Sequence, residues 1–126
     1  VGGGVTDRLK EVIRDERLPF RVIPVNNGDK AKDEYYFNLG AQLWGNVKEL
    51  LETNFSNSMQ GKSTAQIELP KDEEMIKQLS VRKYHMTSRG KIQLESKEDM
   101  KKRGIGSPDT ADSLALALYE PDTWLY

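Results

Sequence analysis

Residues 101–119 read KKRGIGSPDTADSLALALY and predict the end of one helix, a glycine turn and the start of a second helix. Ser107 is a typical N-cap, because its hydroxyl can accept a hydrogen bond from an otherwise unpaired helix amide. Pro108 follows at the first helical position, where its missing N–H is of no consequence. Asp109 and Asp112 should then project from one face of the helix. The stretch therefore predicts a well-capped helix with two carboxylates near its start. Beyond them, the helix should carry an apolar stripe formed by Leu114, Ala115 and Leu118.

The two aspartates admit two interpretations. Acids in a first helical turn are stabilised by the helix dipole, typically by ~0.3–1 kcal/mol, so Asp109 and Asp112 can be no more than favourable helix-start residues. However, Leu116 falls on the same side of the helix and places the acids at the rim of a packed surface. Carboxylates at such a rim would suit Mg²⁺ or Mn²⁺, which take oxygen ligands. Two aspartates are too few for a two-metal phosphodiesterase site, so further ligands would have to come from elsewhere.

The composition is that of a globular protein. The chain has 126 residues, enough for one domain with a core of its own, and is 37% hydrophobic and 31% charged. Its net charge is −1, so no overall basic field indicates nucleic acid. The absence of cysteine excludes disulfides, thiolate metal sites and a cysteine nucleophile. No apolar run is long enough to cross a bilayer and no secretory signal is evident, so we expect a cytoplasmic protein without a membrane partner.

Hydrophobic spacing predicts a mixed α/β chain. Gly90 should supply the positive φ of a tight hairpin turn, and Gly104 should end the helix before it. Helices are expected over residues 6–16, 33–52, 72–79, 96–103 and from 107 onward, with a loop over residues 53–63. Strands are expected over residues 20–25, 64–69, 81–86 and 91–95. The opening glycines, Gly2 to Gly4, are typical of a turn that follows a strand, so we expect the chain to be a fragment cut after one.

Basic residues gather in the last third of the chain. Several of them could line the predicted hairpin and the helix that follows, where they would contact phosphates without reading sequence, although charged faces are often only solvated. The opening glycines lack the spacing of a phosphate-binding loop. His85 has no serine or cysteine partner at a telling position, so acyl transfer is unsupported. The candidate DNA-binding residues are Arg82, Lys83, Arg89, Lys91, Lys101, Lys102 and Arg103.

The stretch SPDTADSLALAL, residues 107–118, resembles the closing helix of the nuclease domain in the large terminase subunits of tailed bacteriophages. Residues 36–44, YFNLGAQLW, and 91–103, KIQLESKEDMKKR, resemble middle segments of that domain in the same order. The opening glycines followed by TDRLKE, residues 6–11, resemble the passage from a catalytic strand into a helix. The resemblance covers nearly the whole chain, which is therefore expected to be the C-terminal part of a single nuclease domain.

This resemblance implies an RNase H-like fold, with a mixed sheet flanked by helices and an added β-hairpin. It also implies Mg²⁺- or Mn²⁺-dependent cleavage of double-stranded DNA during genome packaging, with the portal and the small terminase subunit as partners, in the host cytoplasm. By this match Asp109 is a catalytic metal ligand and Asp112 a second candidate. The strands that carry the family's other acids and its ATPase motor would lie upstream, so we expect these residues alone to be inactive.

Two alternatives stay open from the residues. One is another nuclease with an RNase H-like fold, of the resolvase or transposase type, whose closing helix carries an acid in a similar place. The other is a non-catalytic α/β binding module, in which Asp109 and Asp112 only stabilise a helix start.

Overall fold

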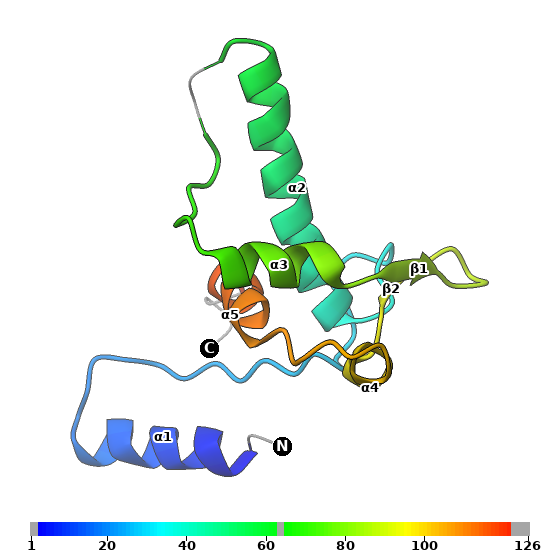
Figure 1. Ribbon diagram of the computed structural model, residues 1–126. Coiled ribbons are helices and arrows are strands. Elements are labelled where there is room, and N and C mark those ends of the chain that lie inside the picture. The colour runs from blue at the N-terminus through cyan, green and yellow to red at the C-terminus, as the bar shows by residue number, and fades with distance from the viewer. Residues whose placement is uncertain (1–2, 63–64, 122–126) are drawn as a thin grey trace.

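The computed structural model describes residues 3–62 and 65–121, and this part of the chain has a mixed α/β fold. Helix α1 is joined to the rest by a long extended segment, and the other elements surround the lower half of the long helix α2 (Figure 1). The elements in chain order are α1 (Gly3–Asp15), α2 (Leu39–Met59), α3 (Glu73–Val81), β1 (Tyr84–Met86), β2 (Ile92–Leu94), α4 (Lys97–Lys102) and α5 (Asp109–Ala117).

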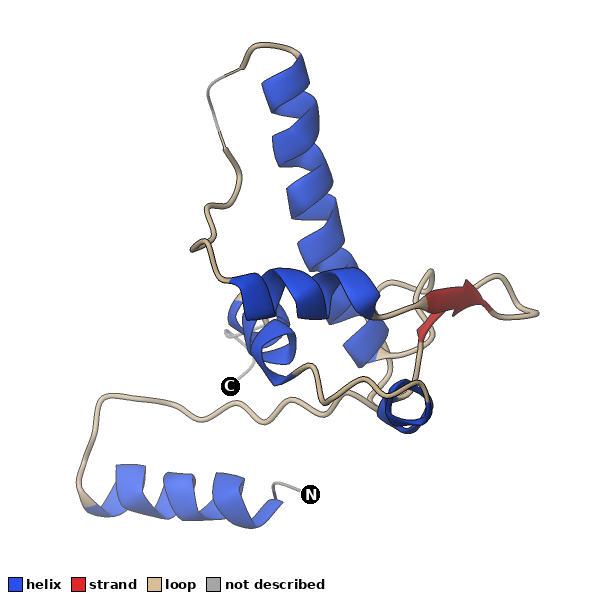
Figure 2. Cartoon of the chain, in the orientation of Figure 1, coloured by secondary structure: helices blue, strands red, loops and turns tan. Residues whose placement is uncertain are grey.

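The predicted hairpin is present, with shorter strands. β1 and β2 pair antiparallel, with His85 opposite Gln93, and the hairpin projects from the helices (Figure 2). Gly90 has φ 78°, so the turn uses the left-handed conformation that glycine adopts without strain. A parallel bridge adds Tyr36 beside Ile92, so the loop before α2 extends the small sheet by one residue. Among the described residues this is the whole of the regular sheet.

The main core lies between α2, α3 and α5. Leu39, Leu43 and Val47 on one face of α2 bury themselves against Ala115 of α5, and Leu79 of α3 packs on this cluster. The apolar stripe predicted for the closing helix is confirmed, since Leu114 and Leu118 also pack against it. Helix α5 contacts both α2 and α3, so its orientation is set by tertiary packing on two sides.

A second cluster joins α2 to the hairpin. Tyr36 and Ala41 are buried together with Ala31, and Ile92 and Leu94 of β2 pack against them. Tyr36 lies directly against the α2 backbone at Gly45, where a Cβ atom would overlap the tyrosine hydroxyl and ring.

Several predicted elements differ from the structure. Residues 20–25 are extended but join no strand ladder in the described part of the chain. Residues 65–69 form no strand either and contain a bend at Gln66; position 64 lies outside that part. The helix expected over residues 33–52 begins only at Leu39, because the Asn38 side chain accepts a hydrogen bond from the Ala41 amide, 3.0 Å away, and caps it there. It continues to Met59 through the predicted loop, because no residue before Gly61 (φ 73°) interrupts it.

The predicted short helices are confirmed more closely. α3 begins after Asp72, whose side chain accepts from the Glu74 and Met75 amides, and α4 begins after the predicted cap Ser96. Among the apolar residues of α3, Ile76 is 53% exposed, whereas Met75 and Leu79, four residues apart, are half-buried. Leu79 packs against the main core.

Helix α1 stands apart from the other elements. It has the predicted apolar positions, but Val5 and Leu9 are exposed and the helix contacts no other helix or strand in the described residues. Gly3 and Gly4 belong to its first turn instead of forming a turn before it; Gly2 lies outside the described residues. None of the helices described is both long and apolar enough to span a bilayer.

The contact between Tyr36 and Gly45 gives a stability prediction. In Gly45→Ala the new methyl group must displace the tyrosine ring, and overpacking of this kind typically destabilises by ~1–3 kcal/mol. We expect urea unfolding to show a lowered midpoint. The matched control is Gly4→Ala in α1, where a Cβ would meet nothing within 4 Å, and there stability should stay level or rise by roughly 0.5–1 kcal/mol. Equal effects in both variants would contradict this close packing.

Candidate functional site

The start of α5 differs from its predicted form. Pro108 itself is the N-cap and no side chain of this segment caps the helix, so the prediction that Ser107 is the N-cap is wrong. The Ser107 hydroxyl instead donates to Asp109 Oδ1 at 2.5 Å. A free amide of the first turn is satisfied from another helix, because Gln78 Oε1 of α3 accepts from the Ala111 amide at 2.9 Å. The start of α5 is therefore capped by a residue of another helix, which the sequence around Asp109 could not predict.

Asp109 and Asp112 have different surroundings. Asp109 is exposed, whereas the Asp112 side chain is 22% exposed and surrounded by donors. Its Oδ1 accepts from the Trp44 indole Nε1 at 2.9 Å, and its Oδ2 lies 2.8 Å from Lys97 Nζ. Arg82 Nη1 lies 3.6 Å from Oδ1. Asp112 thus connects α5 with α2, with α4 and with the α3–β1 junction.

Arg82 is the most enclosed of the predicted DNA-binding residues. Its side chain is 9% exposed, and its Nε donates to the Glu95 carbonyl at 3.0 Å. The guanidinium lies 4.8 Å from the centroid of the Trp44 ring, a cation–π distance. Burial lowers the pKa of Arg82, while Asp112 and Glu95 oppose that shift. The side chain is held inside the fold by three partners.

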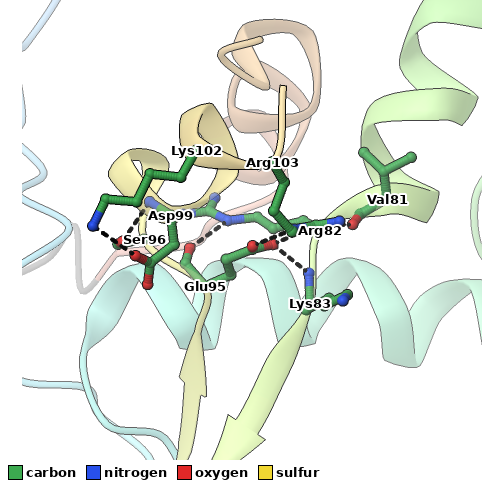
Figure 3. Close-up of polar contacts among 8 residues, drawn as sticks. All are labelled: Val81, Arg82, Lys83, Glu95, Ser96, Asp99, Lys102 and Arg103. Atoms are coloured by element: carbon green, nitrogen blue, oxygen red, sulfur yellow. Dashed lines mark hydrogen bonds and ion pairs between the residues drawn. The ribbon is translucent and has the colours of Figure 1, made fainter. Parts of the chain in front are cut away.

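A second ionic contact closes the base of the hairpin (Figure 3). Arg103 binds Glu95 as a two-pronged pair, Nε to Oε2 and Nη2 to Oε1, both at 2.7 Å. Arg103 Nη2 also donates to the Val81 carbonyl at 2.9 Å, and Glu95 Oε1 accepts from the Lys83 amide at 3.1 Å. The Arg103 hydrogen bonds, with that of the Lys83 amide, hold the pKa of Glu95 at about 2. This pair fixes the two strands to the end of α4.

The remaining predicted DNA-binding residues are at least partly accessible to solvent. Lys83, Arg89 and Lys101 are exposed, and Lys91 is half-buried at the hairpin turn. Lys102 lies 3.9 Å from Asp99, at the outer limit of an ion pair between two exposed side chains. The predicted cations therefore divide into two with structural contacts, Arg82 and Arg103, and a solvent-facing set along the hairpin and α4.

Metal-ligating residues are only partly in place. No group of three or more His, Asp or Glu side chains in the described residues could hold a metal ion. Asp109 is accessible and fits as one oxygen ligand, whereas Asp112 already faces Lys97 and Arg82, so a metal would have to compete with them. The donor set of this part of the chain does not make a complete site by itself. His85 is exposed on β1, as expected for a surface strand histidine.

The sequence did not identify Trp44 and Lys97, which contact Asp112, or Glu95, which contacts Arg82 and Arg103. From the sequence, Trp44 is interpreted as a core residue of its helix, and Lys97 as a residue near the start of another. Glu95 read as the end of a strand. Trp44 and Asp112 are 68 positions apart. Their contact depends on how α2 and α5 cross, which no spacing within one segment reports.

Solved structures of one protein share the fold of this chain. The nuclease domain of the large terminase subunit gp2 of bacterial virus Sf6 matches with TM-score 0.72 at 18% identity, over 96% of this chain. The chain has the terminase nuclease fold. A mutant of the same Sf6 domain solved with manganese matches with TM-score 0.75, and one solved with calcium with 0.72, each at 18% identity and over 96% of this chain. The resemblance in the sequence is thus confirmed at the level of fold.

The match covers only part of the Sf6 domain. This chain spans 62% of the length of the Sf6 domain, so more than a third of that terminase nuclease domain has no counterpart here. No protein-family model and no curated protein sequence matches the chain.

The pairing of Glu95 with Arg103 predicts a specific acid sensitivity. Because the pKa of Glu95 is about 2 in the folded state, against 4.5 for the free group, the pair stabilises the fold above pH 4.5 and this contribution is lost as the pH falls toward 2. Glu95→Gln should therefore lower the urea midpoint at pH 6, with a difference from the unmodified chain that narrows toward pH 2. Glu98→Gln, on the exposed side of α4, is the control. A difference that does not narrow would contradict this role.

Proposed function

We propose that this chain is the C-terminal part of the nuclease domain of a phage DNA-packaging terminase, whose complete domain cleaves double-stranded DNA with Mg²⁺ or Mn²⁺. The observation that carries the proposal is the match in fold to the Sf6 terminase nuclease domain over 96% of this chain. The segments that resemble terminases in sequence supply the second support, because they occur in the family's order. The portal and the small terminase subunit are the expected partners of the longer protein, in the host cytoplasm.

The proposed domain is RNase H-like, with further strands beside this chain. Three features support added strands. Residues 20–25 are extended and belong to no strand ladder of the sheet in the described residues. Helix α1 leaves Val5 and Leu9 exposed without a partner element. A hollow of about 250 Å³ between the extended segment and α5 is lined by apolar side chains, those of Ile23, Val25, Leu116, Tyr119 and Pro121. A sheet that used residues 20–25 as one strand would cover these surfaces.

In this proposal Asp109 is the metal ligand contributed by the closing helix. It is exposed at the start of α5, where an added strand could bring further carboxylates to it. The Sf6 domain was solved with manganese and with calcium, both divalent cations that accept oxygen ligands. A divalent ion held there would supply charge stabilisation for phosphodiester cleavage. Asp112 stays a second candidate, whose carboxylate is occupied by Lys97 and Trp44 in this structure.

The solvent-facing cations supply the proposed DNA contacts. The hairpin projects from the body of the chain (Figure 1), and α4 follows it directly, so exposed side chains on both are accessible to a duplex. Contacts of lysine and arginine with phosphates position DNA without reading its sequence, as a packaging nuclease requires. The proposed contacts are Lys83, Arg89, Lys91, Lys101 and Lys102.

One observation favours the alternative of a non-catalytic binding module. Asp112 is held by an indole and two cations, which is how a structural carboxylate is satisfied. The fold match and the accessibility of Asp109 weigh for the nuclease.

A cleavage assay separates these functions. We expect the 126 residues alone to leave linear duplex DNA intact with Mg²⁺ or Mn²⁺, because the described residues do not assemble a complete acidic site. The longer protein should cleave with either ion, and Asp109→Ala in it should abolish cleavage, whereas Asp99→Ala, an exposed aspartate on α4, should not. Cleavage by the 126 residues that Asp109→Ala removes would disprove the predicted inactivity. A longer protein without metal-dependent cleavage would support the binding module.

A further inference from the structure

Arg82 and Lys83 are adjacent cations with opposite surroundings. Arg82 follows the last turn of α3 as its C-cap residue, and its side chain is 9% exposed. Lys83 is exposed, and its side chain points away from the cluster of polar contacts at the hairpin base (Figure 3). A DNA phosphate could reach Lys83 directly, whereas it could reach Arg82 only if the fold opened.

Arg82, Trp44 and Asp112 form a closed set in which each side chain contacts the other two. The guanidinium lies 4.8 Å from the Trp44 ring centroid, and its Nη1 lies 3.6 Å from Asp112 Oδ1. The same Oδ1 accepts from the Trp44 indole at 2.9 Å. Since the three residues come from the α3–β1 junction, α2 and α5, the set fixes these segments against one another.

The set lies one turn from Asp109 and adds to the packing that orients α5. Asp112 lies three residues after Asp109, about one helical turn, on the same helix. A helix whose side chain is fixed at one position cannot rotate about its axis, so the carboxylate one turn earlier is oriented too. Arg82 lies two residues before β1, so its contact with Asp112 joins the base of the hairpin to the start of α5.

We propose that Arg82 is a positioning residue that holds Asp112 and Trp44 and thereby orients Asp109, and that it does not contact DNA. The part concerning Asp109 as a metal ligand rests on the proposed function. The part concerning Trp44 and the orientation of α5 does not, and it can be measured in this chain alone.

The first test reads the Trp44 indole N–H by ¹⁵N–¹H NMR. The chain has two tryptophans, so Trp124→Phe assigns the signal. In Arg82→Gln we expect the indole resonance to shift and its exchange with solvent to rise by about tenfold or more, because the set loses one member. The Asp109 amide resonance should shift as well. Lys83→Gln removes the same charge one position later and should change neither signal.

A conservative variant keeps the test informative if Arg82→Gln does not fold. Arg82→Lys retains the charge but loses the planar group that stacks on the ring and reaches two acceptors, so it should give an intermediate shift of the indole. Unchanged indole and Asp109 signals in both Arg82 variants would overturn the proposal. So would equal changes in Lys83→Gln, or failure of both Arg82 variants to fold, which would show a general role in the fold.

The second test measures the salt dependence of binding to a duplex DNA. Loss of one phosphate contact lowers the slope of log affinity against log salt by about 1. Lys83→Gln should show this loss, whereas Arg82→Gln should leave the slope unchanged. A slope lowered by about 1 in Arg82→Gln would show a phosphate contact and overturn the proposal. If the unmodified chain binds no DNA, the proposed DNA contacts fail, while the indole test still decides the role of Arg82.

Discussion

The arrangement of the helices in this chain depends on the contacts that the Asp112 carboxylate makes. This carboxylate accepts a hydrogen bond from Trp44 of α2 and lies beside Lys97 of α4 and Arg82 before β1. A half-buried carboxylate without such partners would be costly, so these contacts must form together with the packing of α5 on α2. The aspartate that sequence reasoning offered as a second metal ligand is, in this structure, the point at which the helices are joined.

The basic residues show that neighbours in the sequence can have different surroundings in the fold. Arg82 and Lys83 are neighbours in sequence, yet one is enclosed against Trp44 and the other faces solvent. Arg103 likewise forms a two-pronged pair with Glu95. Arginine suits such structural pairs, because its planar group binds a carboxylate or carbonyl and stacks on a ring at the same time. The proposed DNA contacts are therefore the four accessible lysines and Arg89, which have no such enclosed partners.

Three features of the described residues would be explained by the proposed complete nuclease domain. In the described residues, the extended segment joins no strand ladder, α1 has exposed apolar residues and contacts no other helix or strand, and an apolar hollow lies beside α5. The chain spans 62% of the Sf6 domain. One added sheet would account for all three features, since it would pair the segment and cover both apolar surfaces.

The sequence by itself determined the features that depend on near neighbours: the hairpin with its turn at Gly90, the helix starts at Asp72 and Ser96, and the apolar stripe of α5. It also carried the resemblance that the fold confirms. Only the tertiary structure decided the partners of Asp112, the enclosure of Arg82 and the capping of α5 by Gln78. Those depend on how distant helices cross, and a spacing rule within one segment holds no information about a residue 68 positions away.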